Sequence, residues 1–471
     1  MGNKTNDGAA APHRMLGAAI VAVVAFVLLG RFTGSHVFDL AAVAAMGAAF
    51  LASVRRLGWR EAYLGAIAIL LTALLVATAD EPGRAISRAL DQAAFLMAFI
   101  YLLTLLHETA SRSPSISACG AYLAGQPAGR RYGALFWGSN VMAVLFNLGV
   151  VSLLTPLVQK GLAKRALPPD LKALSERRQI NALLRGFSFN VVWSPTALAP
   201  LAILELIRGV DRGLWSLLGF ALTALIFVAG WLDDRRSARA LAPRAARAEP
   251  PPAPPRSAGL GFLAVVASLF ALVWAISWAA GETIAAGLML ACPILSAAWL
   301  WAQTRGARPV LAAMSEINFS RLPRIAPVAA TLALSGYLGR VAAELTPGAE
   351  IADALDLYGQ PDWIILAVLP PLLALCSFFG VSPIMLAVFF GSLFGSLPEA
   401  PADPTMIALA ISCGWALAML VSPFATIVML LAQQTGARAI TVALGRNAAH
   451  ALAAAILMAA FFWAVETARL L

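Results

Sequence analysis

The sequence predicts an all-α polytopic membrane protein. Hydrophobic residues make up 60% of the chain and charged residues only 12%, whereas charged residues account for about 25% of a typical soluble domain. Apolar stretches of roughly 20 residues, the length that a helix needs to cross a bilayer, recur along the whole chain. The basic residues behind the net charge of +10 gather in a few loops between these stretches, which is the pattern of cytoplasmic loops in membrane proteins.

Residues 1–87 are predicted to form N-terminal scaffold helices. Spans are expected near 15–32, 38–54 and 61–79. The basic loop at 55–60 follows the second span, and placing it in the cytoplasm also places the N-terminus there. No small-residue cleavage site precedes the next polar loop, so we expect the first apolar run to be a retained helix rather than a signal peptide.

Residues 88–232 are predicted to form a first repeat that begins with a scaffold helix near 89–107. The apolar stretch at about 132–160 carries positive charge at both ends. A spanning helix would put one end outside, so a re-entrant hairpin open to the cytoplasm fits better, with a single tilted span as the alternative. Two further spans complete the repeat, near 180–206 and 214–232.

Residues 233–256 separate the two halves of the chain. They are rich in arginine and end in a proline-rich run from Pro250 to Pro255, which predicts a flexible cytoplasmic linker. The segment has no aromatic side chains on which bases could stack, so nucleic-acid binding is not expected. Linking scaffold helices follow over 257–303, with spans near 258–279 and 283–302.

Residues 304–471 are predicted to form a second repeat. From Val341 to Ala437 there is no Lys or Arg, while Asp and Glu are frequent, so the flanks of this region are placed outside. The expected elements are a scaffold helix near 325–344, a hairpin open to the outside at about 363–398, a span at 405–432 and a last helix at 447–468. This order leaves the C-terminus in the periplasm.

A short pattern occurs once in each repeat. It reads Gly186-Phe187, six residues and Ser194-Pro195-Thr196-Ala197 in the first, and Gly414-Trp415, six residues and Ser422-Pro423-Phe424-Ala425 in the second. Each proline removes a helix hydrogen bond inside an apolar stretch, so both helices should be broken there. Matched breaks in oppositely oriented halves indicate an inverted repeat, which is typical of secondary transporters. The chain is thus expected to contain about 11 spans and two hairpins.

The hairpin tips and helix breaks are the predicted binding site. Irregular backbone at membrane depth is tolerated where it lines a cavity, and its freed carbonyls suit Na⁺ while half-helix N-termini suit anions. The candidate residues are Asn147, Gly149, Ser152, Ser194, Pro195 and Thr196 in the first repeat, and Ser377, Gly380, Ser382, Ser422, Pro423 and Thr426 in the second. For each single Ser or Thr the alternative is a hydrogen bond to its own helix backbone.

Charged residues inside the spans bear on the coupling ion. Neither repeat has an Asp or Glu at mid-membrane, and a proton-coupled carrier usually keeps such a group as its relay. Coupling to Na⁺ through neutral oxygens is therefore preferred, and proton coupling remains the alternative. Arg185 lies within its span, where it is a possible contact for an anionic substrate unless it extends to the cytoplasm.

In the order of its elements, its hairpins and its paired breaks, the chain resembles the ion transporter superfamily over roughly residues 88 to 470. Members include divalent anion/sodium symporters, the large membrane subunit of TRAP transporters, and arsenite and short-chain acid carriers. The resemblance implies an elevator mechanism and a homodimer. Sodium-dicarboxylate symporters carry Ser-Asn-Thr at both hairpin tips, whereas these tips read Asn147-Leu148-Gly149-Val150 and Gly380-Val381-Ser382-Pro383, so the substrate is left open.

The sequence therefore predicts a secondary active transporter of a small organic or inorganic anion in the bacterial inner membrane, in contact with lipids and without a cofactor other than Na⁺. A proton-coupled carrier of the same superfamily is one alternative. The other is a membrane-embedded glycan polymerase or ligase. Such an enzyme normally shows a large outer loop with Arg and His, and the longest outer stretch here, 345–362, has neither, so no enzyme activity is expected.

Overall fold

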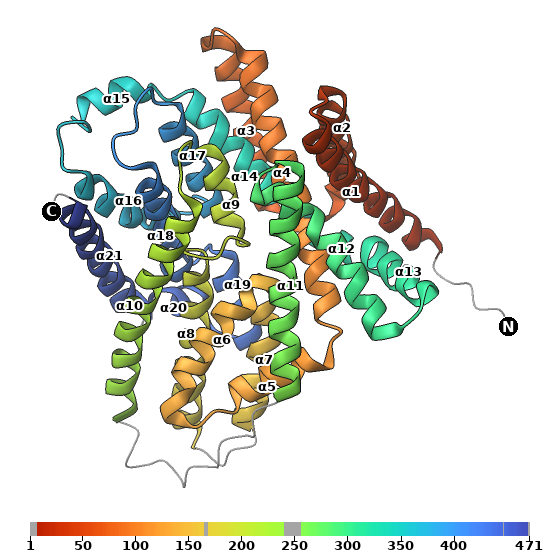
Figure 1. Ribbon diagram of the computed structural model, residues 1–471, viewed down its shortest axis with the longest axis vertical. Coiled ribbons are helices and arrows are strands. Elements are labelled where there is room, and N and C mark those ends of the chain that lie inside the picture. Colours follow the sequence, from red (N-terminus) through yellow and green to blue (C-terminus); the bar gives the residue numbers. More distant parts are fainter. Residues whose placement is uncertain (1–6, 164–167, 240–255, 446, 470–471) are drawn as a thin grey trace. The chain divides into compact units, whose positions relative to one another are not determined.

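The computed structural model describes residues 7–163, 168–239, 256–445 and 447–469, and every regular element in these ranges is a helix (Figure 1). The chain divides into two compact units. Unit 1 consists of Met1–Ser113 and Val265–Thr346, and unit 2 consists of Pro114–Ala264 and Pro347–Leu471. Each predicted repeat therefore contributes its first helix to unit 1 and its remaining elements to unit 2.

Ten helical stretches within the described ranges are long and apolar enough to cross a membrane, which confirms a polytopic membrane protein. Each of them matches one of the spans expected from the sequence. The predicted span at 180–206 has no such counterpart. Its helix begins earlier, at Pro169, carries several charged residues in its first half and ends at Asn190, so the apolar stretch is divided between two shorter helices.

Unit 1 is built around two long helices, α4 and α14, that pack against each other. The bounds of its elements are α1 Asp7–Thr33, α2 His36–Ser53, η1 Val54–Arg56, α3 Trp59–Thr78, α4 Pro82–Ala110, α12 Ile284–Thr304, α13 Ala307–Glu316, η3 Ile317–Arg321, η4 Leu322–Ile325 and α14 Ala326–Glu344. Helix α11, Arg256–Ala280, crosses the boundary between the units. Polar side chains join α3 to α14, because Thr72 bonds Tyr337 and Thr331 donates to Glu61, both at 2.7 Å.

The end of α4 carries an ion-pair network close to the point where the chain leaves unit 1. Arg112 lies 2.9 Å from Glu316, at the end of α13. Arg321 of the π-helical turn η3 bridges Glu316 and Glu108 at 3.2 and 3.3 Å. The last turn of α4 is thus fixed to the segment that leads into α14.

A second network lies at the other end of the same helix pair. Glu344, in the last turn of α14, is 3.4 Å from Arg88 of α4 and 3.5 Å from Arg340 of its own helix. The chain passes into unit 2 directly afterwards, at Thr346. The chain therefore leaves α4 and α14 for unit 2 next to ion pairs that belong to unit 1.

Unit 2 contains two runs of helices that repeat the same packing. The first run is α5 Pro114–Ala124, α6 Ala128–Phe146, α7 Gly149–Ala163, α8 Pro169–Asn190, α9 Leu198–Leu206 and α10 Arg212–Arg239. The second is α15 Gly348–Ala354, α16 Asp362–Phe378, α17 Pro383–Ser396, α18 Pro404–Val421, α19 Thr426–Thr435, α20 Ala439–Leu444 and α21 Asn447–Arg469. Helix α6 packs along α8 as α16 packs along α18, and α9 contacts α17 as α19 contacts α7.

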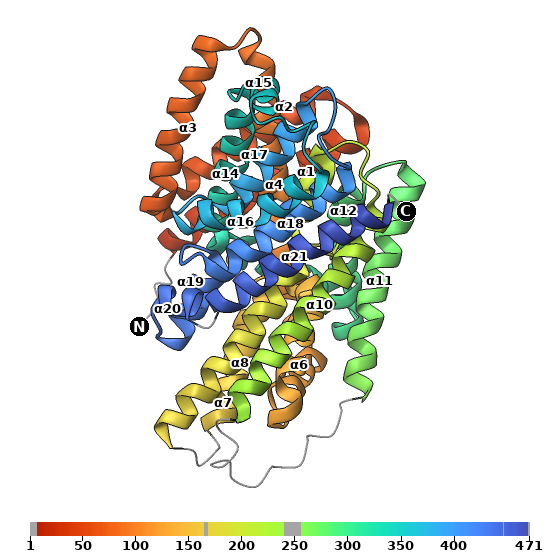
Figure 2. The same cartoon turned by 90° about the vertical axis from the view of Figure 1, so that its left-hand side faces the viewer.

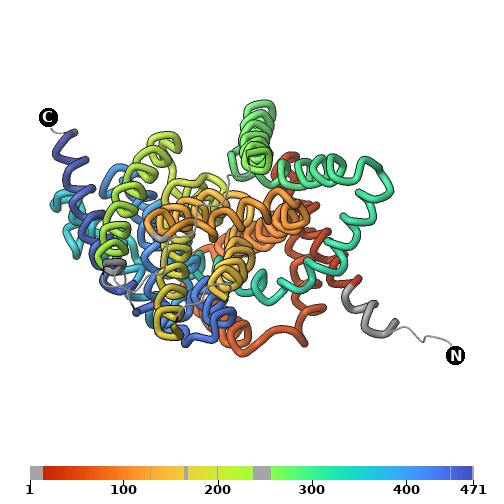
Figure 3. The backbone as a smooth tube through the Cα atoms, turned by 90° about the horizontal axis from the view of Figure 1, so that it is seen from below, coloured from red at the N-terminus to blue at the C-terminus, as the bar shows by residue number. Residues whose placement is uncertain are grey.

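These cross-contacts interlock the two runs. Seen from below, the yellow helices of the first run lie against the blue helices of the second (Figure 3), and the turned view shows α8, α10 and α21 close together (Figure 2). Helix α18 is buried along almost its whole length, from Thr405 to Leu420. The second broken helix therefore forms the centre of unit 2.

The segment predicted as a flexible linker, 233–256, is partly helical. Helix α10 continues to Arg239 and α11 begins at Arg256, because the first charged residues after the apolar run extend the helix without a breaker. The proline-rich part of that prediction lies outside the described residues, as do Arg244 and Arg247.

Candidate functional site

The first helix break lies between α8 and α9. The N–H of Ser194 donates to the carbonyl of Asn190 at 3.0 Å, and the N–H of Ala197 donates to the carbonyl of Ser194 at 3.2 Å. Pro195 has no N–H to donate, so the helix cannot continue through it. The chain makes a short turn and starts a new helix at Leu198.

The second break, between α18 and α19, has the same bonding. The N–H of Ser422 donates to the carbonyl of Ala418 at 2.9 Å, and the N–H of Ala425 donates to the carbonyl of Ser422 at 3.2 Å. Pro423 occupies the position of the first proline. The two copies of the sequence pattern therefore fold into equivalent turns, each followed by a short helix of the same repeat.

The first break is bonded to the last turn of α6, beside the tip of the first helical hairpin, α6–α7. The hydroxyls of Ser194 and Thr196 are hydrogen-bonded at 3.0 Å, and Thr196 donates to the carbonyl of Val144 at 3.3 Å. Both side chains are buried. At the tip itself Asn147 has a φ of 46° and a ψ of −132°, a positive-φ conformation that is uncommon for a residue other than glycine.

The second break is bonded to the second hairpin, α16–α17, in a corresponding way. The hydroxyl of Ser422 donates to the carbonyl of Ser377 at 2.6 Å and accepts from the N–H of Phe424 at 3.2 Å. Gly380 turns the chain at the tip with a φ of +98°, a conformation that a side chain would strain. Each predicted break thus meets the hairpin of its own repeat.

The remaining predicted residues lie at the starts of helices around these turns. Gly149 begins α7, Ser382 directly precedes α17 and Thr426 begins α19. Ser152, in the first turn of α7, is exposed and bonds the side chain of Gln434 at 3.4 Å. The N-termini of three short helices are therefore grouped with the hairpin tips and breaks.

Gln434 was not predicted from the sequence. It lies at the end of α19, and its carbonyl also accepts a bond of 3.1 Å from Gln159 of α7. This residue therefore connects the half-helix after the second break to the hairpin of the first repeat. A glutamine in the last turn of an apolar segment carries no local signal for this role, because the contact depends on the packing of two distant segments.

The glycine of each sequence pattern permits close packing against a hairpin helix. A Cβ at Gly186 would collide with the carbonyl oxygen of Phe136 in α6. A Cβ at Gly414 would lie 2.9 Å from the Leu373 side chain of α16. In both repeats the glycine therefore lets the helix before the break approach the first helix of the hairpin.

Asn140 of α6 strengthens this packing in the first repeat. Its side-chain amide donates to the carbonyl of Gly186 at 2.8 Å, and its carbonyl oxygens accept from Asn190 and from the indole of Trp193 at 2.9 and 3.0 Å. The polar groups of Asn190 and Trp193 therefore hold the hairpin to the broken helix. Asn140 was missed at the sequence level because a single amide in an apolar helix has no distinguishing pattern.

Arg185 is buried and bonded within the protein. Its guanidinium lies 3.2 Å from Asp233 of α10, and its Nε donates to Asn447 of α21 at 3.1 Å. Its side chain is only 2% exposed, so it does not extend to an aqueous surface. The carboxylate bonded to Arg185 in this structure is that of Asp233, in the place that the sequence left open for an anionic substrate.

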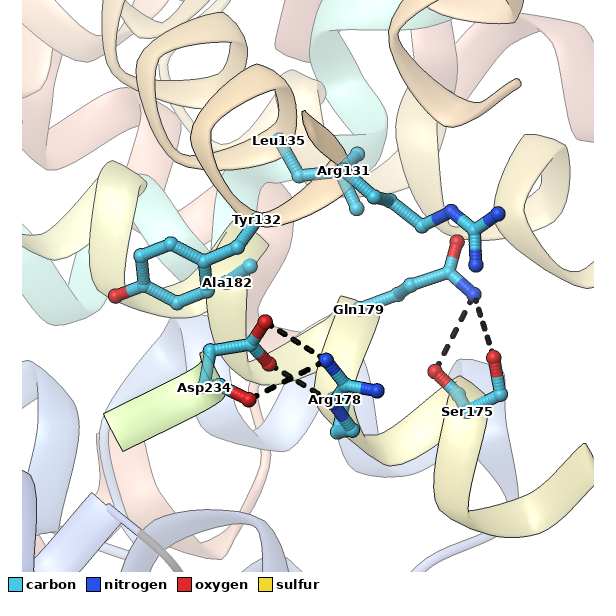
Figure 4. A pocket seen from close by; sticks show the side chains of 8 residues that line it. All are labelled: Arg131, Tyr132, Leu135, Ser175, Arg178, Gln179, Ala182 and Asp234. Atoms are coloured by element: carbon cyan, nitrogen blue, oxygen red, sulfur yellow. Dashed lines mark hydrogen bonds and ion pairs between the residues drawn. The ribbon is translucent and has the colours of Figure 1, made fainter. Parts of the chain in front are cut away.

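A small cavity lies beside α6, α8 and α10, next to the ion pair between Arg178 and Asp234 (Figure 4). It offers about 20 Å³ to the centre of a water molecule, which is room for about one water. Gln179 extends toward it from α8 and bonds Ser175. None of the predicted site residues lines this cavity.

Within the described part of the chain, no group of three or more His, Cys, Asp and Glu residues is placed to hold a metal ion. The oxygens at the tips and breaks are instead hydroxyls, backbone carbonyls and the side-chain amide of Asn147, which are all neutral.

No family model matches this chain, and no curated protein matches its sequence. Among solved structures, it is similar to the crystal structure of the YdaH transporter of Alcanivorax borkumensis, described as having an unusual topology. The TM-score is 0.53 at 15% sequence identity, and the alignment covers 86% of this chain and 98% of that one. At this identity the likeness shows a shared fold.

Replacing Gly186 by Ala should destabilise the protein by about 1–3 kcal/mol, since the added methyl group meets backbone that cannot rotate away. Thermal unfolding of the purified protein in detergent measures the effect. Gly133→Ala in α6 is the matched control, because its Cβ would meet its nearest neighbour at an ordinary 3.5 Å. Equal melting temperatures for the two variants would contradict the close-packing role.

Proposed function

We propose that this protein is a secondary active transporter that moves a small organic or inorganic anion across the bacterial inner membrane, coupled to Na⁺, by an elevator mechanism. The observation that carries the proposal is the pair of equivalent helix breaks, each hydrogen-bonded to the last turn of the first hairpin helix of its own repeat within one compact unit. Secondary transporters place their substrates at such interruptions of duplicated helices.

The division into units supports an elevator. Both hairpins and both broken helices belong to unit 2, whereas the first helix of each repeat belongs to unit 1. The chain crosses between the units after Ser113, within α11 and after Thr346. The first and last of these crossings are corresponding positions of the two repeats. A mobile body that carries substrate needs such a division, and the ion pairs at each end of the α4–α14 pair would hold the stationary side of both connections.

The chemistry of the breaks supports an anion and Na⁺ as ligands. The hydroxyls of Thr196 and Ser422 donate to the carbonyls of Val144 and Ser377. Their oxygens therefore keep lone pairs that can accept at the breaks. Such neutral oxygens suit Na⁺, and the N-termini of α7, α9, α17 and α19 would favour negative charge. The proposal includes a homodimer formed through unit 1, with the N-terminus in the cytoplasm and the C-terminus in the periplasm.

Purified protein in sealed vesicles should accumulate an organic anion when an inward Na⁺ gradient is imposed. A panel of carboxylates, sulfonates and inorganic oxyanions, first ranked by thermal shift with and without Na⁺, supplies the substrates for the uptake assay. Collapse of the gradient with a sodium ionophore should abolish accumulation. Uptake driven only by a pH gradient would overturn sodium coupling and favour the proton-coupled alternative.

Replacing Ser422 by Ala should raise the apparent KM for the substrate or for Na⁺ about tenfold, equivalent to about 1.4 kcal/mol, because a buried hydrogen bond of the break is lost. Ser194→Ala should act in the same direction. Ser412→Ala is the matched control, since this buried serine of α18 bonds only its own helix, at Ala408. Unchanged kinetics for both Ser194→Ala and Ser422→Ala would remove these residues from the site.

Spin labels should show that the two units move as bodies. In a background without the four native cysteines, the exposed residues Leu70 and Leu311 of unit 1 and Leu217 and Leu452 of unit 2 accept labels. Distances measured by pulsed EPR within each unit should stay constant when Na⁺ and substrate are added, while distances between the units should change by several ångström. A change confined to one unit would contradict the elevator.

A further inference from the structure

Three helices of unit 2 meet at Arg185. This residue belongs to α8, the helix that ends at the first break, and its side chain is only 2% exposed. The two terminal nitrogens of its guanidinium donate to one oxygen of Asp233 at 3.2 and 3.3 Å. Its Nε donates to the side-chain oxygen of Asn447 at 3.1 Å. All three nitrogens of the guanidinium are therefore bonded to neighbouring helices.

Asn447 is itself held in one orientation. Its side-chain NH₂ donates to the carbonyl of Val442 at 2.8 Å and to the side-chain oxygen of Asn181 at 3.3 Å. Both amide hydrogens are used in this way, so the amide oxygen is directed at Arg185. Since Asp233 lies on α10 and Asn447 on α21, the last helices of both repeats meet the first broken helix here.

The helix between Arg185 and the break is fixed on other sides as well. Asn140 of α6 bonds the carbonyl of Gly186 and receives the bond of Asn190. On α21 the ring of His450 packs edge-on against Phe189, with 6.2 Å between the ring centroids. A shift of α8 at Arg185 would therefore be transmitted along a rigid, packed helix to Ser194.

We propose that Arg185, Asp233 and Asn447 form a buried joint that positions the first helix break, and that Arg185 is a positioning residue rather than a ligand of the transported anion. The inference deepens the proposed function and rests on it for its effect on transport. A guanidinium already neutralised by an internal carboxylate gains little from a substrate carboxylate. Removing Asp233, whose side chain is 49% exposed, leaves the buried guanidinium of Arg185 without its carboxylate, which is strongly unfavourable. Removing Arg185 takes away the bonds that join α8 to α10 and α21.

The two readings of Arg185 give opposite results for Asp233→Asn. If Arg185 positions the break, Asp233→Asn and Arg185→Gln impair the same structure and have similar effects, and the double variant is no worse than either one. If Arg185 binds the anion, Asp233→Asn releases the guanidinium for the substrate and lowers KM, while Arg185→Gln raises it.

The chain contains a matched control pair. Arg178 and Asp234 belong to the same two helices and are bonded at 2.8 and 2.9 Å, but neither is bonded to α21 in the structure as described, and Arg178 lies nearer the start of α8 (Figure 4). Arg178→Gln removes an equivalent ion pair without touching the joint. Arg185→Lys keeps the charge beside Asp233 but offers one nitrogen in place of the three that bond Asp233 and Asn447.

Hydrogen exchange of the full-length protein, without substrate, tests the joint directly. Amides of residues 191–194, 196 and 197 should exchange about tenfold faster in Arg185→Gln and in Asp233→Asn, equivalent to about 1.4 kcal/mol. The double variant should show no larger increase, Arg185→Lys a smaller one and Arg178→Gln none. Unchanged exchange in both single variants would overturn the joint. If Arg185→Gln does not fold, Asp233→Asn and Arg185→Lys still decide the result.

Transport kinetics with Na⁺-driven uptake of the best anion separate the two roles. Raised KM in both Asp233→Asn and Arg185→Gln supports positioning, whereas a lowered KM in Asp233→Asn together with a raised KM in Arg185→Gln would assign Arg185 to the substrate. If the wild-type protein accumulates no anion, the proposed function fails, and the exchange data still establish or overturn the joint.

Discussion

The need to satisfy every backbone polar group inside the bilayer shapes this protein more than any other constraint. A proline inside an apolar helix frees carbonyls that water cannot reach, and each freed group is costly in hydrocarbon. At both breaks a hydroxyl of the Ser-Pro turn donates to a carbonyl near the end of the adjacent hairpin helix. Beside the first break, the hydroxyls of Ser216 and Thr223 in α10 donate to carbonyls of the broken helix. The elements around the breaks are therefore joined by hydrogen bonds inside unit 2.

These hydrogen bonds join the elements around the breaks inside one unit. A helix that contributes no irregular backbone, such as α4 or α14, can belong to a different unit without leaving any polar group unsatisfied. The helices that surround the breaks cannot. The glycines of the sequence pattern act in the same direction, since Gly186 and Gly414 bring the broken helices into close contact with α6 and α16. The ion pairs of Glu316 and Glu344 lie in unit 1, next to the points where the chain leaves α4 and α14 for unit 2. They stiffen the ends of these two helices rather than the Ser-Pro turns.

Much of this fold is visible in the sequence, because its main signals are local. Apolar length predicts the spans, the two Ser-Pro pairs predict the breaks, and the duplicated pattern relates the halves. What the sequence could not show are contacts between distant segments. Asn140 and Gln434 are single amides in apolar helices, and only the packing of α6 on α8 and of α19 on α7 reveals what they bond. The start of the span predicted at 180–206 was wrong for a related reason. The helix begins at Pro169, because the charged residues before Gln179 are also helical and make tertiary contacts such as the Arg178–Asp234 ion pair. The binding role of the predicted residues stays a prediction.

The two halves of the candidate site are equivalent in backbone and unequal in chemistry. In the first repeat the broken helix carries Asn181, Arg185 and Asn190 and is held by polar bonds to α6, α10 and α21. In the second, α18 is nearly all apolar, and its Ser412 bonds only its own backbone. Hydrogen bonds fix direction more tightly than apolar contacts do. The helix before the first break is therefore oriented by polar bonds, whereas the helix before the second is oriented by packing and its turn is held by the hydroxyl of Ser422. In an elevator with one shared site, this difference would make the first broken helix the more strictly oriented of the two.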